Sequence, residues 1–202
     1  MQPSQTKPET LRQPAYDIDP VFIQRWSPRS FANKDVPEET LFSLFEAARW
    51  APSANNMQPW RFIVARTKED LETFHSFILP GNLAWCQNAP ALAVLASATT
   101  TERGDNRAHA FDAGTAWGYL ALEATRQGLV THAMGGFDRE KARAALGLPD
   151  DVEPQIVIAI GYRGEKEALP ENLQEREQPN GRRPLNETVF EGGFGKVIDA
   201  LK

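Results

Sequence analysis

Two short polar clusters contain the residues best suited to bind a ligand. Residues 25–31 read Arg-Trp-Ser-Pro-Arg-Ser-Phe, which places two guanidiniums and two hydroxyls in one short segment. Arginine presents a rigid fork of N–H donors that matches a phosphate. Residues 51–60 read Ala-Pro-Ser-Ala-Asn-Asn-Met-Gln-Pro-Trp, and amide side chains both donate and accept hydrogen bonds, as the edge of a heterocycle requires. Together the clusters predict a pocket for a molecule with an anionic tail and a flat, polar head.

Each cluster also has a plainer interpretation. An Arg-x-x-x-Arg segment is most often an exposed basic turn, although Ser27 between the arginines and the rigid Pro28 favour a phosphate site here. Ser53 alone is typical of a turn that follows a helix. The whole run from Ser53 to Gln58 is more than a turn requires, and it leads directly into Trp60 and a predicted core strand. We therefore interpret both clusters as binding segments and keep a turn as the alternative for Ser53.

Two further segments are weaker candidates. Gly135-Gly136 is by itself a flexible turn before a helix, or a place where backbone N–H groups approach a ligand closely. Arg182-Arg183 is by itself a surface pair of charges, or two cations that a polar arm delivers to a distant phosphate. Neither glycine pattern of the dinucleotide-binding or phosphate-loop type is present.

No side chain stands out as a nucleophile or a metal ligand. Cys86 lies among apolar residues with no adjacent base, and no Gly-x-Ser-x-Gly segment occurs. The three histidines are scattered, so we expect no metal site. A site that has groups for binding and none for covalent chemistry suggests that a cofactor carries the reaction.

The composition is that of an ordinary globular protein. Of the 202 residues, 41% are hydrophobic and 24% are charged, and the net charge is −5. Such an acidic chain is not expected to bind nucleic acid or an anionic membrane, so any anion site must be local. No apolar run approaches the roughly 20 residues of a membrane-spanning helix, and no signal-peptide pattern is visible. With a single cysteine, we expect a cytoplasmic protein.

Hydrophobic periodicity and turn residues predict the order of the elements. We expect a flexible arm over 1–17 and a single domain over 18–202, which includes an extended C-terminal arm over about 163–190. Helices are predicted over 18–25, 37–50, 67–77, 108–127 and 139–146. Strands are predicted over 60–65, 91–97, 129–133 and 155–160. The remaining predictions are a turn at Pro80-Gly81-Asn82 and a mobile loop over 98–107.

The predicted fold is an α+β sandwich, with helices on both sides of a small, mixed sheet that is mainly antiparallel. The run 91–97 is almost uniformly apolar, which is typical of a central strand buried on both faces. Helix 108–127 has so little polar surface that we expect it in the middle of the domain or at a subunit interface. The aromatic residues expected mainly in the core are Trp50, Trp60, Trp85, Phe111 and Trp117.

The set of motifs resembles the nitroreductase family of FMN-dependent oxidoreductases over roughly residues 18–190. The order and approximate spacing of the segments agree with that family, and the set is far more specific than any one of them. The segments that carry the resemblance are 25–31, 51–60, the helix that ends at Gly128, Gly135-Gly-Phe-Asp138, Leu146-Gly-Leu-Pro149, Ile158-Ala-Ile-Gly-Tyr162 and Arg182-Arg-Pro-Leu185.

The resemblance implies a three-layer sandwich and a homodimer that exchanges its C-terminal arms and binds FMN where the subunits meet. Arg25 and Ser27 would hold the phosphate, and Arg29 would lie beside the pyrimidine side of the flavin ring. Arg183, together with Arg182, would return to the phosphate.

The resemblance also assigns residues to the ring itself. Ser53 and Asn56 would come from the neighbouring subunit, Gly135 and Gly136 would lie under the ring, and Asn82 is a looser match to a ring-contacting asparagine. The complete cofactor-binding set that we expect is Arg25, Trp26, Ser27, Arg29, Pro52, Ser53, Asn56, Gln58, Asn82, Gly135, Gly136, Arg182 and Arg183.

This chain departs from the family pattern in two places. Many members carry an acidic residue where Gly135 stands and a lysine near Gly181. The first departure limits the ring contact to backbone groups. The second leaves phosphate binding more dependent on Arg182 and Arg183.

The implied reaction is hydride transfer from NADH or NADPH, through bound FMN, to a nitroaromatic, a quinone or another electrophilic small molecule. It would proceed in two half-reactions, with the charge of Arg29 stabilising the reduced flavin. Two alternatives stay open: a flavin-using relative with different chemistry, such as reductive dehalogenation or flavin breakdown, and a non-catalytic FMN-binding protein.

Overall fold

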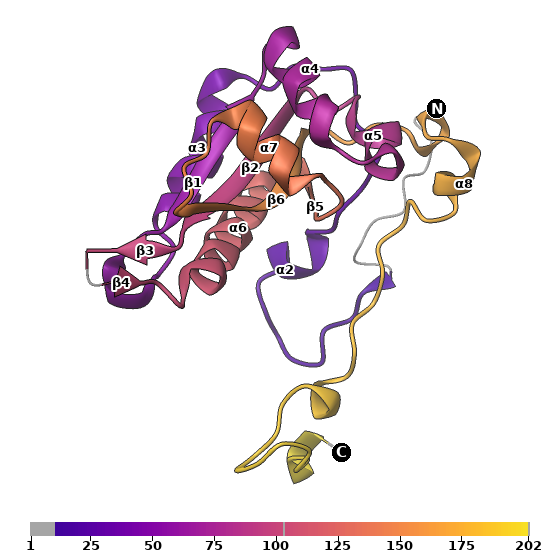
Figure 1. Cartoon of the computed structure of the whole chain (residues 1–202). Coiled ribbons are helices and arrows are strands. Elements are labelled where there is room, and N and C mark those ends of the chain that lie inside the picture. Colours follow the sequence, from indigo (N-terminus) through magenta and orange to yellow (C-terminus); the bar gives the residue numbers. More distant parts are fainter. Residues whose placement is uncertain (1–10, 103, 202) are drawn as a thin grey trace.

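Antiparallel strands form the sheet at the centre of this computed structural model, which describes residues 11–102 and 104–201 (Figure 1). The strand order is β1-β2-β6-β5, and every neighbouring pair is antiparallel. The strands are β1 (Trp60–Ala65), β2 (Ala91–Ala98), β5 (Val130–Met134) and β6 (Val152–Gly161). The predicted strands are confirmed, and no parallel pair occurs among the described residues.

Side chains of the two middle strands alternate between two separate cores. On β2, Leu92 and Val94 belong to one core, whereas Ala93 and Leu95 belong to the other. Strand β6 repeats this alternation, and all of these side chains are almost fully buried. Because successive side chains of a strand point to opposite faces, an apolar run of this kind requires cover on both faces of the sheet.

Helices supply that cover on each face (Figure 1). Helices α3 (Glu38–Arg49) and α6 (His109–Arg126) pack on one face, and their buried residues include Leu44 and Leu120. The opposite core receives residues of α4 (Lys68–Phe77), α5 (Pro80–Cys86) and α7 (Arg139–Leu146). The α+β sandwich of three layers is therefore confirmed.

Local capping explains where several helices begin and end. The Thr67 hydroxyl accepts a hydrogen bond from the backbone N–H of Asp70 at the start of α4. The Asp138 carboxylate accepts one from the backbone N–H of Lys141 at the start of α7. Helix α7 ends at Gly147, whose φ of 63° suits glycine because a side chain is strained in that region. These helix ends agree with the sequence prediction.

Three predictions about local structure are wrong. Pro80 and the residues after it begin α5 instead of forming a turn, because proline is well accommodated in the first turn of a helix. The predicted loop over 98–107 contains a short hairpin of β3 (Thr100–Thr101) and β4 (Gly104–Asp105). Trp50, expected mainly in the core, is 69% exposed, whereas Trp60 and Trp85 are buried as predicted.

Helix α6 leaves part of its apolar surface uncovered in the single chain. Phe111 is 79% exposed and Tyr119 is 42% exposed, although Ala116 and Leu120 on the same helix are fully buried. The expectation that Phe111 lies mainly in the core is therefore wrong. Of the two places expected for this helix, the middle of the domain does not hold for one face of α6, and a subunit interface stays a prediction. Among the described residues, no helix combines the length and apolar character needed to cross a membrane.

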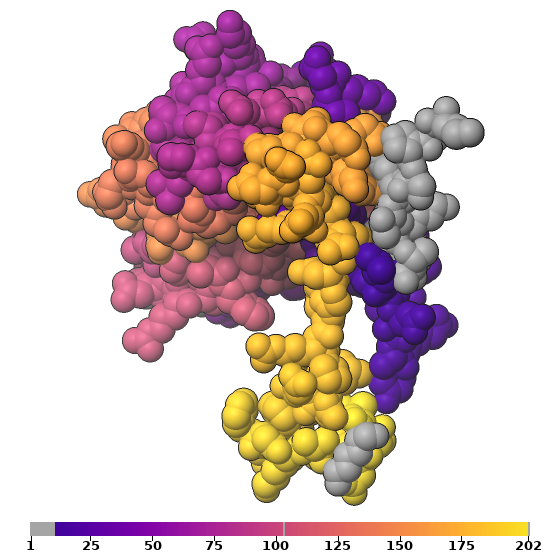
Figure 2. All heavy atoms as spheres, turned by 90° about the vertical axis from the view of Figure 1, so that its right-hand side faces the viewer, coloured from indigo at the N-terminus to yellow at the C-terminus, as the bar shows by residue number. Residues whose placement is uncertain are grey.

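The C-terminal arm leaves the body of the molecule (Figures 1 and 2). Its first part packs on the body, since Arg163 forms a β-bridge with Phe31 and Leu169 is buried. Its last part stands apart, and Phe194 there is 97% exposed. The short elements outside the sandwich are α2 (Val21–Gln24), η1 (Ala54–Asn56), η2 (Lys166–Ala168), α8 (Glu171–Gln174), η3 (Leu185–Glu187) and η4 (Asp199–Leu201).

His132 on β5 connects the sheet to the arginine-containing segment. Its ring packs against Trp85, with 4.5 Å between the ring centroids. Its Nδ1 lies 2.9 Å from the carbonyl oxygen of Pro28, and because a carbonyl only accepts, Nδ1 carries the proton. Burial, together with the neighbouring charges of Arg29 and Arg25, lowers the pKa of His132 to about 4, although the hydrogen bond to Pro28 opposes this shift. His132 is therefore neutral at pH 7.

We expect the ligand-free protein to lose stability as the pH falls from about 6.5 to about 4, the ordinary and the folded-state pKa of His132. In this window the unfolded chain binds a proton that the folded chain does not, so the free energy of unfolding decreases by at most about 1.4 kcal/mol per pH unit. Urea unfolding of the wild type and of His132→Gln across this range measures the effect. Equal pH slopes for the two proteins would contradict the assignment.

Candidate functional site

The first polar cluster opens onto a hollow of about 520 Å³, which we call the arginine hollow. Its lining contains five arginines and one carboxylate, although the whole chain has a net charge of −5. The lining residues are Arg12, Arg25, Trp26, Ser27, Arg29, His132, Glu175, Arg176, Gln178, Asn180 and Arg182. The structure thus concentrates positive charge at one place on an acidic protein.

The guanidiniums of the arginine hollow repel one another. Burial lowers the pKa of Arg25, and the nearby charge of Arg182 lowers it further. Burial lowers the pKa of Arg29 as well, and Arg176 adds to this effect while Glu177 opposes it. Arginine nevertheless stays charged at neutral pH. An anion in the hollow would offset this repulsion, so the hollow is suited to a phosphate.

Contacts with distant strands and loops hold the segment 25–31 in place. The backbone N–H of Ala32 donates to the carbonyl of Tyr162, at 2.9 Å. The Ser30 hydroxyl donates to the carbonyl of Glu165, at 2.5 Å. Trp26 is buried, and the guanidinium of Arg163 lies 4.9 Å from its ring centroid. Contacts with residues 162–165 therefore hold the segment on the side away from the arginine hollow, and Arg25 and Arg29 line the hollow.

Glu177 of the C-terminal arm binds the backbone of this segment. Its carboxylate accepts hydrogen bonds from the backbone N–H of Arg29, at 3.0 and 2.9 Å, and from that of Ser30, at 3.0 Å. Glu177 is only 5% exposed. The sequence prediction missed it, because one glutamate in a polar arm carries no local signal of a partner 147 or 148 residues away.

Arg12 is a second residue that the sequence prediction missed. Its guanidinium donates to the carbonyl oxygens of Ile23 at 3.0 Å, Arg25 at 2.7 Å and Asn180 at 2.8 Å. It therefore ties the N-terminal segment to the C-terminal arm and to the end of α2. Residues 1–10 of the expected flexible arm lie outside the described residues, and the domain boundary at residue 17 stays a prediction.

Of the two glycines after β5, Gly136 lies next to Asn82. The Asn82 side-chain amide donates to the carbonyl oxygen of Gly136, at 3.1 Å. A Cβ on Gly136 would lie 2.5 Å from the Asn82 nitrogen, so a side chain at this position would force Asn82 to move. No neighbouring atom would obstruct a Cβ on Gly135. Because Gly135 follows His132 by three residues, it lies within about 10 Å of a residue that lines the arginine hollow.

The second polar cluster forms a tight loop at another place on the chain. The Ser53 hydroxyl accepts a hydrogen bond from the backbone N–H of Gln58, at 3.0 Å, so the turn expected as the alternative for Ser53 is present. The backbone N–H of Ala54 donates to the buried Asp112 carboxylate of α6, at 3.1 Å. Pro52, Asn56 and Gln58 are exposed. Their side chains are therefore available to a ligand or a second chain.

Backbone strain is concentrated in the same loop. Asn55, Asn56 and Gln58 have φ values of 49°, 55° and 47°. Asparagine tolerates this left-handed region, but a glutamine there is uncommon. Such strain tends to occur at sites of function, where the surrounding structure holds it.

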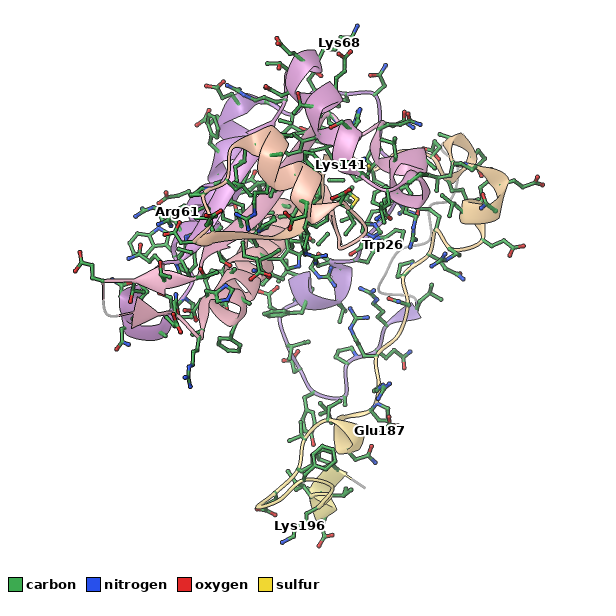
Figure 3. The ribbon with its side chains drawn as sticks, viewed as in Figure 1. Trp26, Arg61, Lys68, Lys141, Glu187 and Lys196 are labelled. Atoms are coloured by element: carbon green, nitrogen blue, oxygen red, sulfur yellow. The ribbon has the colours of Figure 1, made fainter. Side chains whose placement is uncertain are left out.

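One chain does not bring the two clusters together. The second cluster borders a different hollow of about 700 Å³, whose lining includes Asn55, Met57 and Arg61. Figure 3 shows Trp26 and Arg61 on opposite sides of the body. Of the two late arginines, Arg182 lines both the arginine hollow and a neighbouring, largely apolar groove of about 650 Å³, whereas Arg183 lines only the groove.

Comparisons with known proteins agree with this geometry. The family model for the nitroreductase family matches residues 23–84 and 74–162. An NADH dehydrogenase of Thermus thermophilus is 31% identical over 186 residues, which cover 76% of this chain and 90% of that protein.

Solved structures show the same fold. A structure described as an oxidoreductase containing FMN has a TM-score of 0.87 and 40% identity, and the match covers 92% of this chain and 96% of that one. A nitroreductase family protein of Clostridium difficile 630 has a TM-score of 0.70 at 24% identity and shares the fold, over 89% of this chain and all of that one. The chain belongs to the nitroreductase family of oxidoreductases.

Proposed function

We propose that the protein binds FMN and transfers hydride from NADH or NADPH to an electrophilic small molecule such as a nitroaromatic or a quinone. The observation that carries this proposal is the arginine hollow, in which five arginines face one carboxylate. The related structure that contains FMN at 40% identity supports the choice of ligand. Bound FMN would supply the two-electron chemistry, and the protein would supply binding and orientation.

The phosphate end of FMN fits the arginine hollow. Arg25 and Ser27 lie side by side, with 3.5 Å between Arg25 Nη1 and Ser27 Oγ, so both can donate to one phosphate. Arg182 lines the same hollow. Arg183 lies at the adjoining groove and would reach the phosphate only after a movement of the exposed arm.

The ring of FMN would lie toward Arg29 and the Gly135-Gly136 turn. A permanent positive charge on Arg29 would stabilise the negative charge that develops on the flavin during reduction. Gly135 has no side chain and would let backbone groups approach the ring. Asn82 holds the Gly136 carbonyl and would keep this turn in place.

The second polar cluster would reach the flavin of a neighbouring subunit. Pro52, Ser53, Asn56 and Gln58 lie away from the arginine hollow of their own chain. The uncovered face of α6, with Phe111 exposed, offers an apolar surface for a homodimer. The projecting C-terminal arm would be exchanged between the two subunits.

The single cysteine is not available as a nucleophile for this reaction. Cys86 is fully buried, and burial raises the pKa of its thiol to about 12. A thiol in this state is inert. The absence of a second cysteine fits the reduced conditions of the cytoplasm, where we expect the protein to act.

Arg25→Ala should weaken FMN binding by about tenfold or more, because a charge-assisted hydrogen bond to the phosphate contributes about 1.5–3 kcal/mol. Quenching of FMN fluorescence during titration with the FMN-free protein gives the dissociation constant. Lys68→Ala is the matched loss of one positive charge, on the exposed surface of α4 away from Trp26 (Figure 3). An unchanged affinity for Arg25→Ala, or an equal loss for Lys68→Ala, would argue against the phosphate site.

Purified protein should be yellow, and anaerobic addition of NADH or NADPH should bleach the flavin absorbance. Addition of a quinone or a nitroaromatic should then restore the colour, since both half-reactions use the same bound flavin. Stopped-flow absorbance measures each step separately. A flavin that neither nucleotide reduces would exclude the proposed electron donor, and a colourless protein that takes up no FMN would exclude the whole proposal.

A further inference from the structure

We propose that Glu177 is a positioning residue that holds the Arg29–Ser30 backbone so that the Arg29 side chain faces the flavin. This inference rests on the proposed function and extends it to a residue of the C-terminal arm. The family model matches residues 23–162, so it does not include this arm.

The hydrogen bonds of Glu177 are directed at one short piece of backbone. Both carboxylate oxygens accept from the N–H of Arg29, and one of them also accepts from the N–H of Ser30. A carboxylate that accepts several backbone N–H groups is a strong, charge-assisted anchor. These two N–H groups belong to the residue whose guanidinium lines the arginine hollow and to its neighbour.

The surroundings of Glu177 explain how a carboxylate is stable there. It is 5% exposed, and its charge is close enough to raise the pKa of Arg29 and of Arg163 against the opposing effect of their burial. The carboxylate is therefore buried among cations and backbone donors. It also places one negative charge where the lining guanidiniums of the arginine hollow repel one another.

The segment on each side of Arg29 is held by other groups. On one side, the carbonyl of Pro28 is bonded to His132. On the other side, the Ser30 carbonyl accepts from the N–H of Gly164, at 2.9 Å. Glu177 is the partner of the N–H groups between these two points, so its loss removes the anchor of the backbone at Arg29 itself.

A double-mutant cycle with Arg29 separates positioning from an independent effect. Glu177→Gln keeps the size of the side chain and removes its charge, and we expect FMN to bind about tenfold more weakly to it. If Glu177 acts through Arg29, then Arg29→Ala combined with Glu177→Gln should bind FMN about as weakly as Arg29→Ala alone. A loss equal to the product of the two single losses would overturn the proposal, as would unchanged binding to Glu177→Gln.

The reduction potential of bound FMN gives a second readout. The direction in which Glu177→Gln changes this potential decides between two explanations. Removal of a nearby negative charge would by itself make reduction easier and raise the potential. Displacement of the Arg29 guanidinium would make reduction harder and lower it. We expect a lower potential in Glu177→Gln at saturating FMN, and a higher one would overturn the proposal.

Two controls keep the test informative. Glu171→Gln removes an exposed carboxylate from the same arm, and FMN binding and potential should stay unchanged. If Glu177→Gln does not fold, hydrogen exchange of the wild type still tests the contact: the N–H groups of Arg29 and Ser30 should be protected, and rapid exchange would overturn the proposal. A wild type that binds no FMN would instead refute the proposed function.

Discussion

The repulsion among closely spaced guanidiniums is the constraint on which the site depends. Five arginines line one hollow of a chain whose net charge is negative. They stay together because backbone carbonyls and one buried carboxylate compensate them: Arg12 donates to three carbonyl groups, and Glu177 binds the backbone beside Arg29. Burial lowers the pKa of Arg25 and Arg29, and the neighbouring charges of Arg182 and Arg176 lower these pKa values further. A bound phosphate would add to the compensation of these charges.

The sandwich supplies the rigid base for this arrangement. Strand β5 carries His132, whose ring packs on Trp85 and bonds to the carbonyl of Pro28, so the sheet edge and the arginine-containing segment are joined directly. The same strand leads to Gly136, which is held by Asn82 of α5. Groups proposed for the phosphate and for the ring are thus fastened to one strand. Both faces of the sheet are covered by helices, which leaves its edges and connecting loops for binding.

The two polar clusters lie apart in the single chain, which favours a contribution from a second chain to the binding site. The strained loop around Asn56 is exposed and lies away from the arginine hollow of its own chain. Its cost in backbone energy is offset locally by Ser53 and by the buried Asp112. This position agrees with our proposal that the loop contacts the flavin bound to a second chain. The exposed Phe111 on α6 and the projecting Phe194 are further surfaces that a single chain leaves uncovered.

Local patterns in the sequence determined the layered fold, because periodicity and capping act within a few residues: the apolar run of β2, the Asp138 cap and the Gly147 helix end follow from them. The motif around Arg25 and Ser27 was likewise recognisable from its spacing.

Tertiary structure alone decided that Arg12 and Glu177 join the site. Their partners lie as far as 168 and 148 residues away, and a hydrogen bond between such distant groups leaves no periodic or compositional trace. The tertiary structure also decided that Phe111 stays exposed, since a helical pattern shows which residues are apolar but not what covers them.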